Sequence, residues 1–125
     1  MTAALVAVLL LVAADDVEEW VAPEAERARA NPVAASDAAL AKGRALFQKN
    51  CARCHGAKGD GEGPAGVDLR DPELQERLTD GEIFWKISTG RKDGPEVVMP
   101  SLARVVKAEE DRWKVVLFVR SLRAQ

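Results

Sequence analysis

Two cysteines and one histidine that stand close together, Cys51, Cys54 and His55, constrain this chain more than any other feature. Thiols three positions apart lie on the same side of a helical turn, and the imidazole follows immediately. C-x-x-C-H is the attachment pattern of c-type haem, in which each thiol forms a thioether bond and the histidine binds the iron. The motif therefore predicts a covalently attached haem held by Cys51 and Cys54, with His55 as an axial ligand.

Two other chemistries use a C-x-x-C pair. A thioredoxin-like thiol oxidoreductase places it after a strand in a β-α-β pattern, and no strand pattern precedes Cys51. A structural zinc site needs four Cys or His ligands, whereas the chain has 2 cysteines and 1 histidine. The sequence favours haem attachment over both of these alternatives.

Met99 is the second strong signal, because the initiator is the only other methionine of the chain. A thioether sulfur opposite a histidine on haem iron raises the reduction potential. Pro100 follows and disfavours the α conformation at Met99, so we expect the residue in a loop, with its side chain able to reach into a pocket. Core packing is the commoner role of methionine, but beside C-x-x-C-H the sequence predicts Met99 as the second axial ligand.

Four segments in a characteristic order resemble a class I c-type cytochrome: Cys51-x-x-Cys54-His55-Gly56, Gly63-Pro64, Met99-Pro100 and a C-terminal amphipathic helix. The resemblance covers about residues 36–124. It implies an all-α, cytochrome c-like fold in which N- and C-terminal helices cross and glycine-rich loops surround one covalently attached haem c.

The resemblance also implies three further contacts with the cofactor. The carbonyl of Pro64 would accept a hydrogen bond from the second N–H of His55 and so fix the orientation of the ring. A helix from Thr79 to about Ser88 would wall the haem pocket and bring Phe84 and Trp85 to it. The glycine-rich loop after His55 would fold against the haem edge.

Helical patterns are also predicted at both ends of this region. A helix over about 37–50 places Gly43 and Phe47 on one face, and a helix over about 108–123 carries an apolar stripe that includes Phe118. A glycine inside a helix costs about 1 kcal/mol relative to alanine, so Gly43 indicates a close helix contact. We expect the two helices to cross there, with Phe118 in the contact. Between them, 71–78 is a short helical turn and 91–98 a loop that delivers Met99.

The N-terminal part of the chain divides into two predicted segments. Residues 1–14 contain an apolar run that is shorter than the roughly 20 residues needed to span a bilayer, as in a cleaved secretory signal, although an uncleaved anchor is the alternative. Residues 15–35 look like a linker or arm in which Trp20 caps the domain surface. The cytochrome c domain then occupies residues 36–125. A signal implies an extracytoplasmic, periplasmic location, with membrane association through the N-terminal segment as the alternative.

These features predict an electron carrier rather than an enzyme, because His55 and Met99 together leave no open iron position. A nearly balanced charge, 18 basic against 20 acidic residues, gives no basic stripe for nucleic acid. The expected partners are a redox protein donor and a redox protein acceptor. Two alternatives stay open: a haem-bearing subunit of a larger membrane or periplasmic redox complex, and an open-site haem enzyme or gas sensor.

Overall fold

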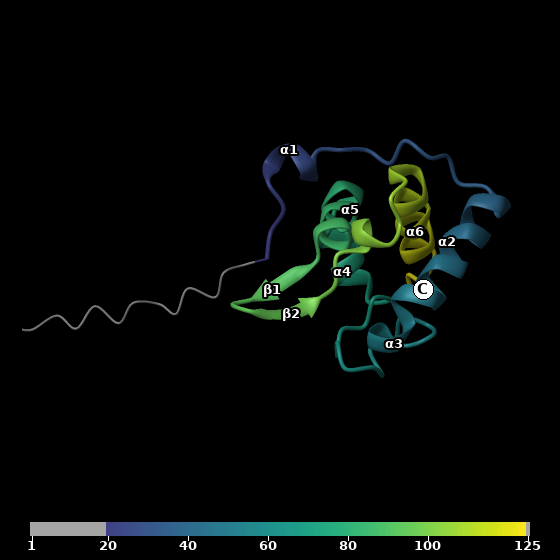
Figure 1. Cartoon of the computed structure of the whole chain (residues 1–125). Coiled ribbons are helices and arrows are strands. Elements are labelled where there is room, and N and C mark those ends of the chain that lie inside the picture. Colours follow the sequence, from purple (N-terminus) through teal and green to yellow (C-terminus); the bar gives the residue numbers. More distant parts are fainter. Residues whose placement is uncertain (1–19, 125) are drawn as a thin grey trace, which may run out of the picture.

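A computed structural model describes residues 20–124, so the predicted signal or anchor at 1–14 lies outside the described residues. This part of the chain is mostly helical, with one small sheet (Figure 1). Its elements are α1 (Glu24–Arg27), α2 (Asp37–Asn50), α3 (Ala52–His55), α4 (Pro72–Arg77), α5 (Asp80–Thr89), β1 (Arg91–Asp93), β2 (Glu96–Met99), the 3-10 helix η1 (Leu102–Arg104) and α6 (Glu109–Ser121). Within residues 20–124, no helix has the length and apolar character needed to cross a membrane.

Helices α2 and α5 each begin at a residue whose side chain caps the helix. The Ser36 hydroxyl accepts a hydrogen bond from the Ala39 N–H (3.0 Å) at the start of α2, and the Thr79 hydroxyl accepts one from the Glu82 N–H (3.1 Å) at the start of α5. Each bond satisfies a backbone donor that has no partner inside the helix. Helix α5 ends at Gly90, whose φ of 68° lies in the region that favours glycine.

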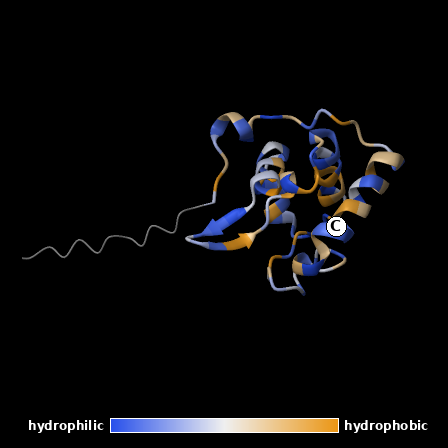
Figure 2. Ribbon diagram, viewed as in Figure 1, coloured by the Kyte–Doolittle hydropathy of each residue, from blue (hydrophilic) through white to orange (hydrophobic). Residues whose placement is uncertain are grey.

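Helices α2 and α6 pack across each other, which confirms the predicted crossing of the first and last long helices (Figure 1). A Cβ at Gly43 would collide with the backbone carbonyl of Lys114 in α6, so only glycine allows this approach. The rings of Phe47 and Phe118 meet in the same contact, with centroids 5.1 Å apart and planes inclined at 56°. Figure 2 shows hydrophobic residues, in orange, on the sides of α2, α5 and α6 that face one another.

The segment predicted as a loop over 91–98 instead forms a short antiparallel hairpin of β1 and β2. Gly94, with a φ of 57°, supplies the positive φ that a tight two-residue turn needs at its first position. The strands are exposed and show no apolar alternation, which is why hydrophobic periodicity does not reveal them. A register irregularity between Arg91 and Lys92 places Met99 opposite Arg91 at the end of the hairpin.

Residues 20–35 lie against the helical domain rather than extending away from it. In Figure 1 they pass over the ends of α5 and α6 before entering α2. Helix α1 contacts α5, and Ala22 is 4% exposed. The part of the predicted arm that the structure describes is therefore packed onto the domain.

Candidate cofactor site

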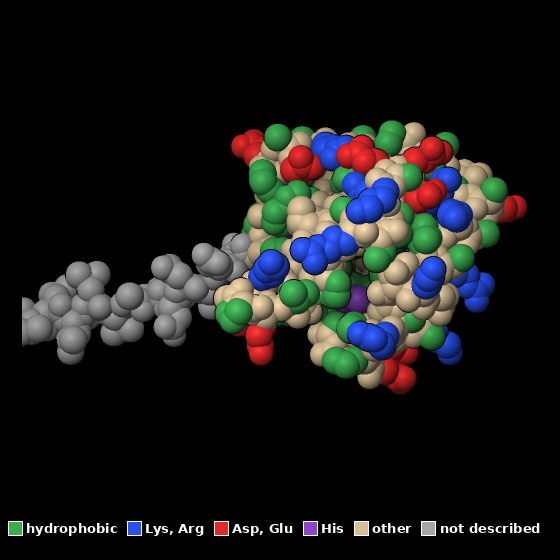
Figure 3. Space-filling view, in the orientation of Figure 1, with side chains coloured by type: hydrophobic (Ala, Val, Ile, Leu, Met, Phe, Trp, Pro, Cys, Tyr) green, Lys and Arg blue, Asp and Glu red, His purple; other side chains and the backbone are tan. Residues whose placement is uncertain are grey.

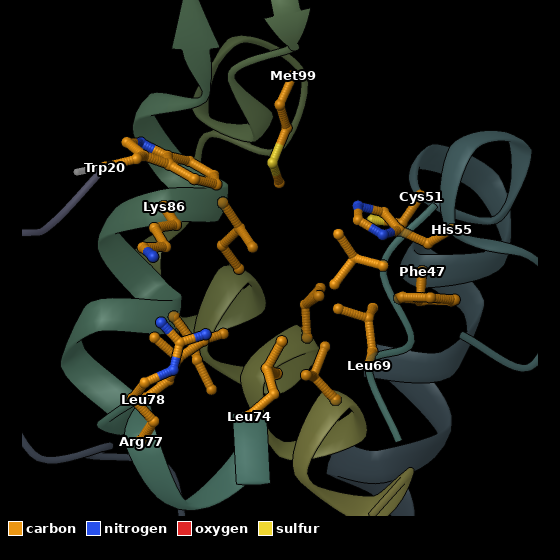
Figure 4. Close-up of a pocket in the computed structure, with 15 residues that line it drawn as sticks. Trp20, Phe47, Cys51, His55, Leu69, Leu74, Arg77, Leu78, Lys86 and Met99 are labelled. Carbon is orange, nitrogen blue, oxygen red and sulfur yellow. The ribbon is translucent and has the colours of Figure 1, made fainter. Parts of the chain in front are cut away.

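An apolar pocket of about 240 Å³ lies between α2, α4, α5, α6 and the end of the hairpin (Figure 4). Most of its wall is made of aliphatic and aromatic side chains. They include Phe47, Leu69, Leu74, Ile83, Ile87 and Val119. Cys51, His55 and Met99 also line it. Three of the four predicted haem ligands therefore face one cavity, although Met99 comes from a separate part of the chain.

The C-x-x-C-H motif forms a tight helical turn directly after α2. Cys51 ends α2 and also precedes α3, and its carbonyl accepts hydrogen bonds from the N–H groups of Cys54 (3.1 Å) and His55 (3.0 Å). The turn brings the two thiols near each other on one side, although only Cys51 lines the pocket. No disulfide joins them, and both are partly exposed.

The Cys51 thiol does not have the character of a redox-active thiol. Burial, with a smaller contribution from neighbouring Cys54, raises the pKa of Cys51 to about 11. Reactive thiols of thioredoxin-like sites have lowered pKa values, because the thiolate is the nucleophile. Here the pair follows a helix rather than a strand. Both observations disfavour a thiol oxidoreductase.

A zinc site has no support in the described residues either. Within residues 20–124, no group of three His, Cys, Asp or Glu side chains lies close enough together to hold a metal ion. A structural zinc ion is almost always bound by four such ligands. The donor set around His55 is instead one imidazole, one thioether and two thiols, which fits the axial and covalent bonds of a c-type haem.

His55 is suited to act as a neutral metal ligand. Burial lowers its pKa below the ordinary value of 6.5, which favours the uncharged imidazole that binds metals. Its Nδ1 atom is buried and has no hydrogen-bond partner. A buried polar atom without a hydrogen bond costs free energy, so the Nδ1 atom of His55 can still accept or donate one more bond. In Figure 3 the histidine is visible at a hollow in the surface.

The predicted hydrogen bond from the His55 ring to the Pro64 carbonyl is not formed in the structure. Pro64 is exposed and lies inside a turn that the Gly66 N–H closes onto the Gly63 carbonyl (3.1 Å). The imidazole Nδ1 has no partner there. The role of Pro64 toward His55 stays a prediction for the haem-bound chain.

The glycine-rich loop itself folds closely onto α3. The Ala65 N–H donates to the Cys54 carbonyl (3.0 Å) and the Gly61 N–H to the His55 carbonyl (3.2 Å). A Cβ at Gly63 would collide with the Cys54 carbonyl, so the loop can approach the motif only because this residue is glycine. These bonds hold the loop against the backbone of the C-x-x-C-H motif, which carries the two predicted attachment cysteines and His55.

Met99 reaches the pocket from the last position of β2. In Figure 4 its side chain points into the cavity from the hairpin, while His55 enters from the side of α2 and α3. Pro100 ends the strand, as expected from its lack of a backbone donor. The pocket thus has an imidazole and a thioether on different walls with apolar space between them.

The structure does not bring Phe84 and Trp85 to the pocket. Phe84 is 3% exposed and stacks on Trp113, with ring centroids 4.0 Å apart. The residues of α5 that do line the pocket are Ile83, Lys86 and Ile87, of which the two isoleucines lie one helical turn apart. The sequence places these isoleucines on one face, but the rotation of α5 against α6 decides which side of that face meets the cavity.

The sequence did not indicate that three further residues, Trp20, Arg77 and Lys86, line the pocket. Trp20 belongs to the segment before the domain, and its position depends on contacts that no local pattern reveals. Arg77 and Lys86 read as surface charges of amphipathic helices. A lone tryptophan in a charged segment is the one signal that could have drawn attention to this wall.

One protein family and two characterised proteins are similar to this chain over most of its length. A family model described as "Cytochrome C oxidase, cbb3-type, subunit III" matches residues 38–119. The Cbb3-type cytochrome c oxidase subunit CcoP of Rubrivivax gelatinosus is 36% identical over 94 residues, which cover 74% of this chain and 29% of that protein. Cytochrome c550 of Pseudomonas aeruginosa is 34% identical over 96 residues, which cover 73% of this chain and 61% of the relative. The chain therefore spans less than two thirds of the length of either relative.

Proposed function

Since this chain belongs to the cbb3-type subunit III family of class I c-type cytochrome domains, whose members transfer electrons through haem, we propose that it carries single electrons on one covalently bound haem c. Cys51 and Cys54 would attach the ring, and His55 and Met99 would be its two axial ligands. The observation that carries this proposal is the meeting of Cys51, His55 and Met99 at one apolar pocket.

The bound haem would supply an iron centre that gains and loses one electron. The protein's residues then set the conditions for that exchange. His55 offers a neutral imidazole, because burial lowers its pKa, and Met99 offers a soft sulfur ligand that favours reduced iron. The aliphatic wall excludes water, which also tunes the potential. With two protein ligands in place, little rearrangement accompanies the change of charge.

We propose a carrier and not an open-site enzyme, and carbon monoxide distinguishes the two. The reduced wild-type protein is expected not to bind carbon monoxide, because His55 and Met99 occupy both axial positions. Met99→Ala is expected to bind it and to have a lower reduction potential. Val98→Ala is the matched control, because this neighbour is 56% exposed and does not line the pocket. Binding by the wild-type protein would instead support an enzyme or gas sensor.

The electron donor and acceptor are proposed to be redox proteins outside the cytoplasm. C-type attachment in this family takes place there, and the apolar run in residues 3–14 has the character of a secretory signal. Cell fractionation, with mass spectrometry of the N-terminus, tests this location. A protein found in the cytoplasmic fraction would contradict it, and an intact Met1 on a membrane-bound protein would indicate the anchored alternative.

A second candidate is a permanent subunit of a larger redox complex. It is supported by the similarity to a protein named as a subunit of a cbb3-type oxidase. The other relative is named only as cytochrome c550, and its name does not mention a complex. Mild extraction followed by native size analysis distinguishes the two. Co-migration with a fixed set of partners supports the subunit, and a single small species supports the carrier.

A further inference from the structure

Trp20 lines the candidate cofactor pocket, although it precedes the region that the family model matches. Figure 4 shows its ring on the wall opposite His55, beside Lys86 and across the cavity from Cys51. The Lys86 ammonium lies 4.7 Å from the centroid of this ring, and the Arg91 guanidinium lies 5.6 Å from it. Cation–π contacts at these distances favour one position of the indole. The pocket is therefore completed by a residue from the N-terminal arm.

The arm, residues 20–35, is fastened to the domain at several points. The Thr79 hydroxyl donates to the Arg27 carbonyl (2.7 Å), and the Arg27 Nε pairs with the Glu82 carboxylate (3.1 Å). Farther along the arm, the Asn31 amide donates to the Trp113 carbonyl (3.1 Å). These bonds connect the arm to α5 and α6, so the position of Trp20 is built into the fold.

Basic side chains surround the corner of the pocket beside Trp20. Arg77 and Lys86 line both the cofactor pocket and an adjoining cavity of about 470 Å³, which Trp20 and Arg27 also line. Glu82 is the acidic residue among those lining this second cavity. The corner thus joins an apolar pocket to a group of cations.

These cations outnumber the carboxylate that could neutralise them. Glu82 pairs with both Arg27 (3.1 Å) and Lys86 (3.4 Å) and is only 5% exposed. Arg77 and Arg91 form no ion pair and no side-chain hydrogen bond with any residue in the described part of the chain. A charge excess at the edge of an apolar pocket favours an anionic group there. A planar apolar ligand that carries carboxylates would match both parts of this site.

We propose that Trp20, Arg77 and Lys86 form the subsite that takes the carboxylate groups of the cofactor, and that the N-terminal arm is therefore part of the cofactor site. This inference rests on the proposed haem function. Arg77 supplies the unpaired guanidinium, which can bind a carboxylate through two parallel N–H groups. Lys86 adds a second charge, and Trp20 covers the apolar side of the corner.

The test is a titration of the reduction potential of the haem-loaded full chain against pH. Ionisation of a cofactor carboxylate adds a negative charge that stabilises oxidised iron, so the potential falls as pH rises through the pKa of that carboxylate. A neighbouring cation lowers this pKa. Arg77→Gln is expected to raise it, by about threefold to tenfold in proton affinity once solvent screening is allowed for, and to lower the potential at neutral pH.

Arg44→Gln is the matched control, because it removes the same charge from an exposed position of α2 that does not line the pocket. If the curves of reduction potential against pH were the same for Arg77→Gln and Arg44→Gln, the proposal that Arg77 binds a cofactor carboxylate would be wrong. Failure of the haem function itself is recognised separately, since no haem spectrum would then be seen in the wild-type protein.

A second pair of variants tests the arm. Trp20→Ala is expected to lower the reduction potential, because water entering the corner stabilises the more highly charged oxidised centre, whereas Trp20→Phe should retain most of the wild-type value. Trp85→Ala is the control, because Trp85 does not line the pocket. Equal potentials for Trp20→Ala and Trp85→Ala would contradict a role of the arm in the site.

Discussion

Gly43 of α2 lies directly against the backbone carbonyl of Lys114 in α6. Gly43→Ala therefore sets two effects against each other. Alanine improves helix propensity by about 1 kcal/mol, but its Cβ would collide with a backbone atom that cannot turn aside. Overpacking of this kind costs about 1–3 kcal/mol, and we expect the collision to dominate. Denaturant unfolding of the haem-loaded protein is expected to show a net loss of stability.

Ala38→Leu provides the comparison, because it adds a larger side chain at an exposed position of the same helix. It is expected to change the free energy of unfolding by less than about 0.5 kcal/mol. A Gly43→Ala protein more stable than wild type would mean that helix propensity dominates and that the helices do not approach as closely as described.

Arg112 is a buried cation held by oxygens other than carboxylates. It is 7% exposed, and it donates to the Val106 carbonyl (2.8 Å), the Lys107 carbonyl (3.0 Å) and the Ser88 hydroxyl (3.0 Å). Arg112→Met keeps much of the apolar stem but leaves these acceptors without their donor. We expect a loss of about 2–3 kcal/mol in the free energy of unfolding. Arg104→Met, at an exposed position, should change the free energy of unfolding very little. Equal losses in the two variants would contradict a stabilising role of the buried Arg112 hydrogen bonds.

Gly81 allows the arm to pack on α5, because a Cβ there would collide with the Glu26 carbonyl. Gly81→Ala is expected to loosen residues 20–35. Trypsin should then cleave faster after Arg27 and Arg29 than in the wild-type protein. Gly43→Ala serves as the control, since it disturbs a different contact. Equal cleavage rates in the two variants would show general destabilisation rather than release of the arm.

Asp68 and Arg70 flank Leu69, a residue of the pocket wall. Hydrogen bonds from the Arg70 side chain (3.0 and 3.1 Å) and its backbone N–H (2.9 Å) lower the pKa of Asp68 below its ordinary value of 3.8. A lowered folded pKa adds stability above pH 3.8, which is lost as the pH falls through the folded value. The effect should be small at this exposed site.

An NMR titration of the Asp68 carboxyl group checks this prediction. Its midpoint should lie below 3.8 in the wild-type protein and should rise toward that value in Arg70→Gln. An unchanged midpoint in the variant would show that Arg70 is not the cause of the shift.

The sequence predicted those parts of the molecule that depend on local chemistry. The start of a helix at Thr79, the glycine of the helix crossing and the C-x-x-C-H turn each depend on a few neighbouring residues or on a single close contact. Pro100 also indicated that Met99 would leave the helical part of the chain. That Met99 faces the same cavity as His55 was inferred from ligand chemistry, because Met99 is the only internal methionine, and not from any local pattern.

The walls of the pocket were harder to predict, because tertiary packing decides them. Ile83 and Phe84 are adjacent in sequence, and only the packing of α5 on α6 directs the first to the cavity and the second onto Trp113. Trp20 reaches the pocket through the contacts of the arm with α5, which have no periodic signature. The hairpin had a usable signal in Gly94-Pro95, because a glycine at the first position is typical of one class of two-residue hairpin turn, but its strands are too short for an alternating pattern.

The central claim is that one haem is bonded to Cys51 and Cys54, and the mass of the intact, denatured protein tests it most directly. Denaturation releases a haem that is held only by packing or by axial ligands, whereas thioether bonds survive. We predict a single species with the mass of the polypeptide plus one haem, and loss of this species in the double variant Cys51→Ala, Cys54→Ala. A wild-type protein that has the mass of the bare polypeptide would contradict the account.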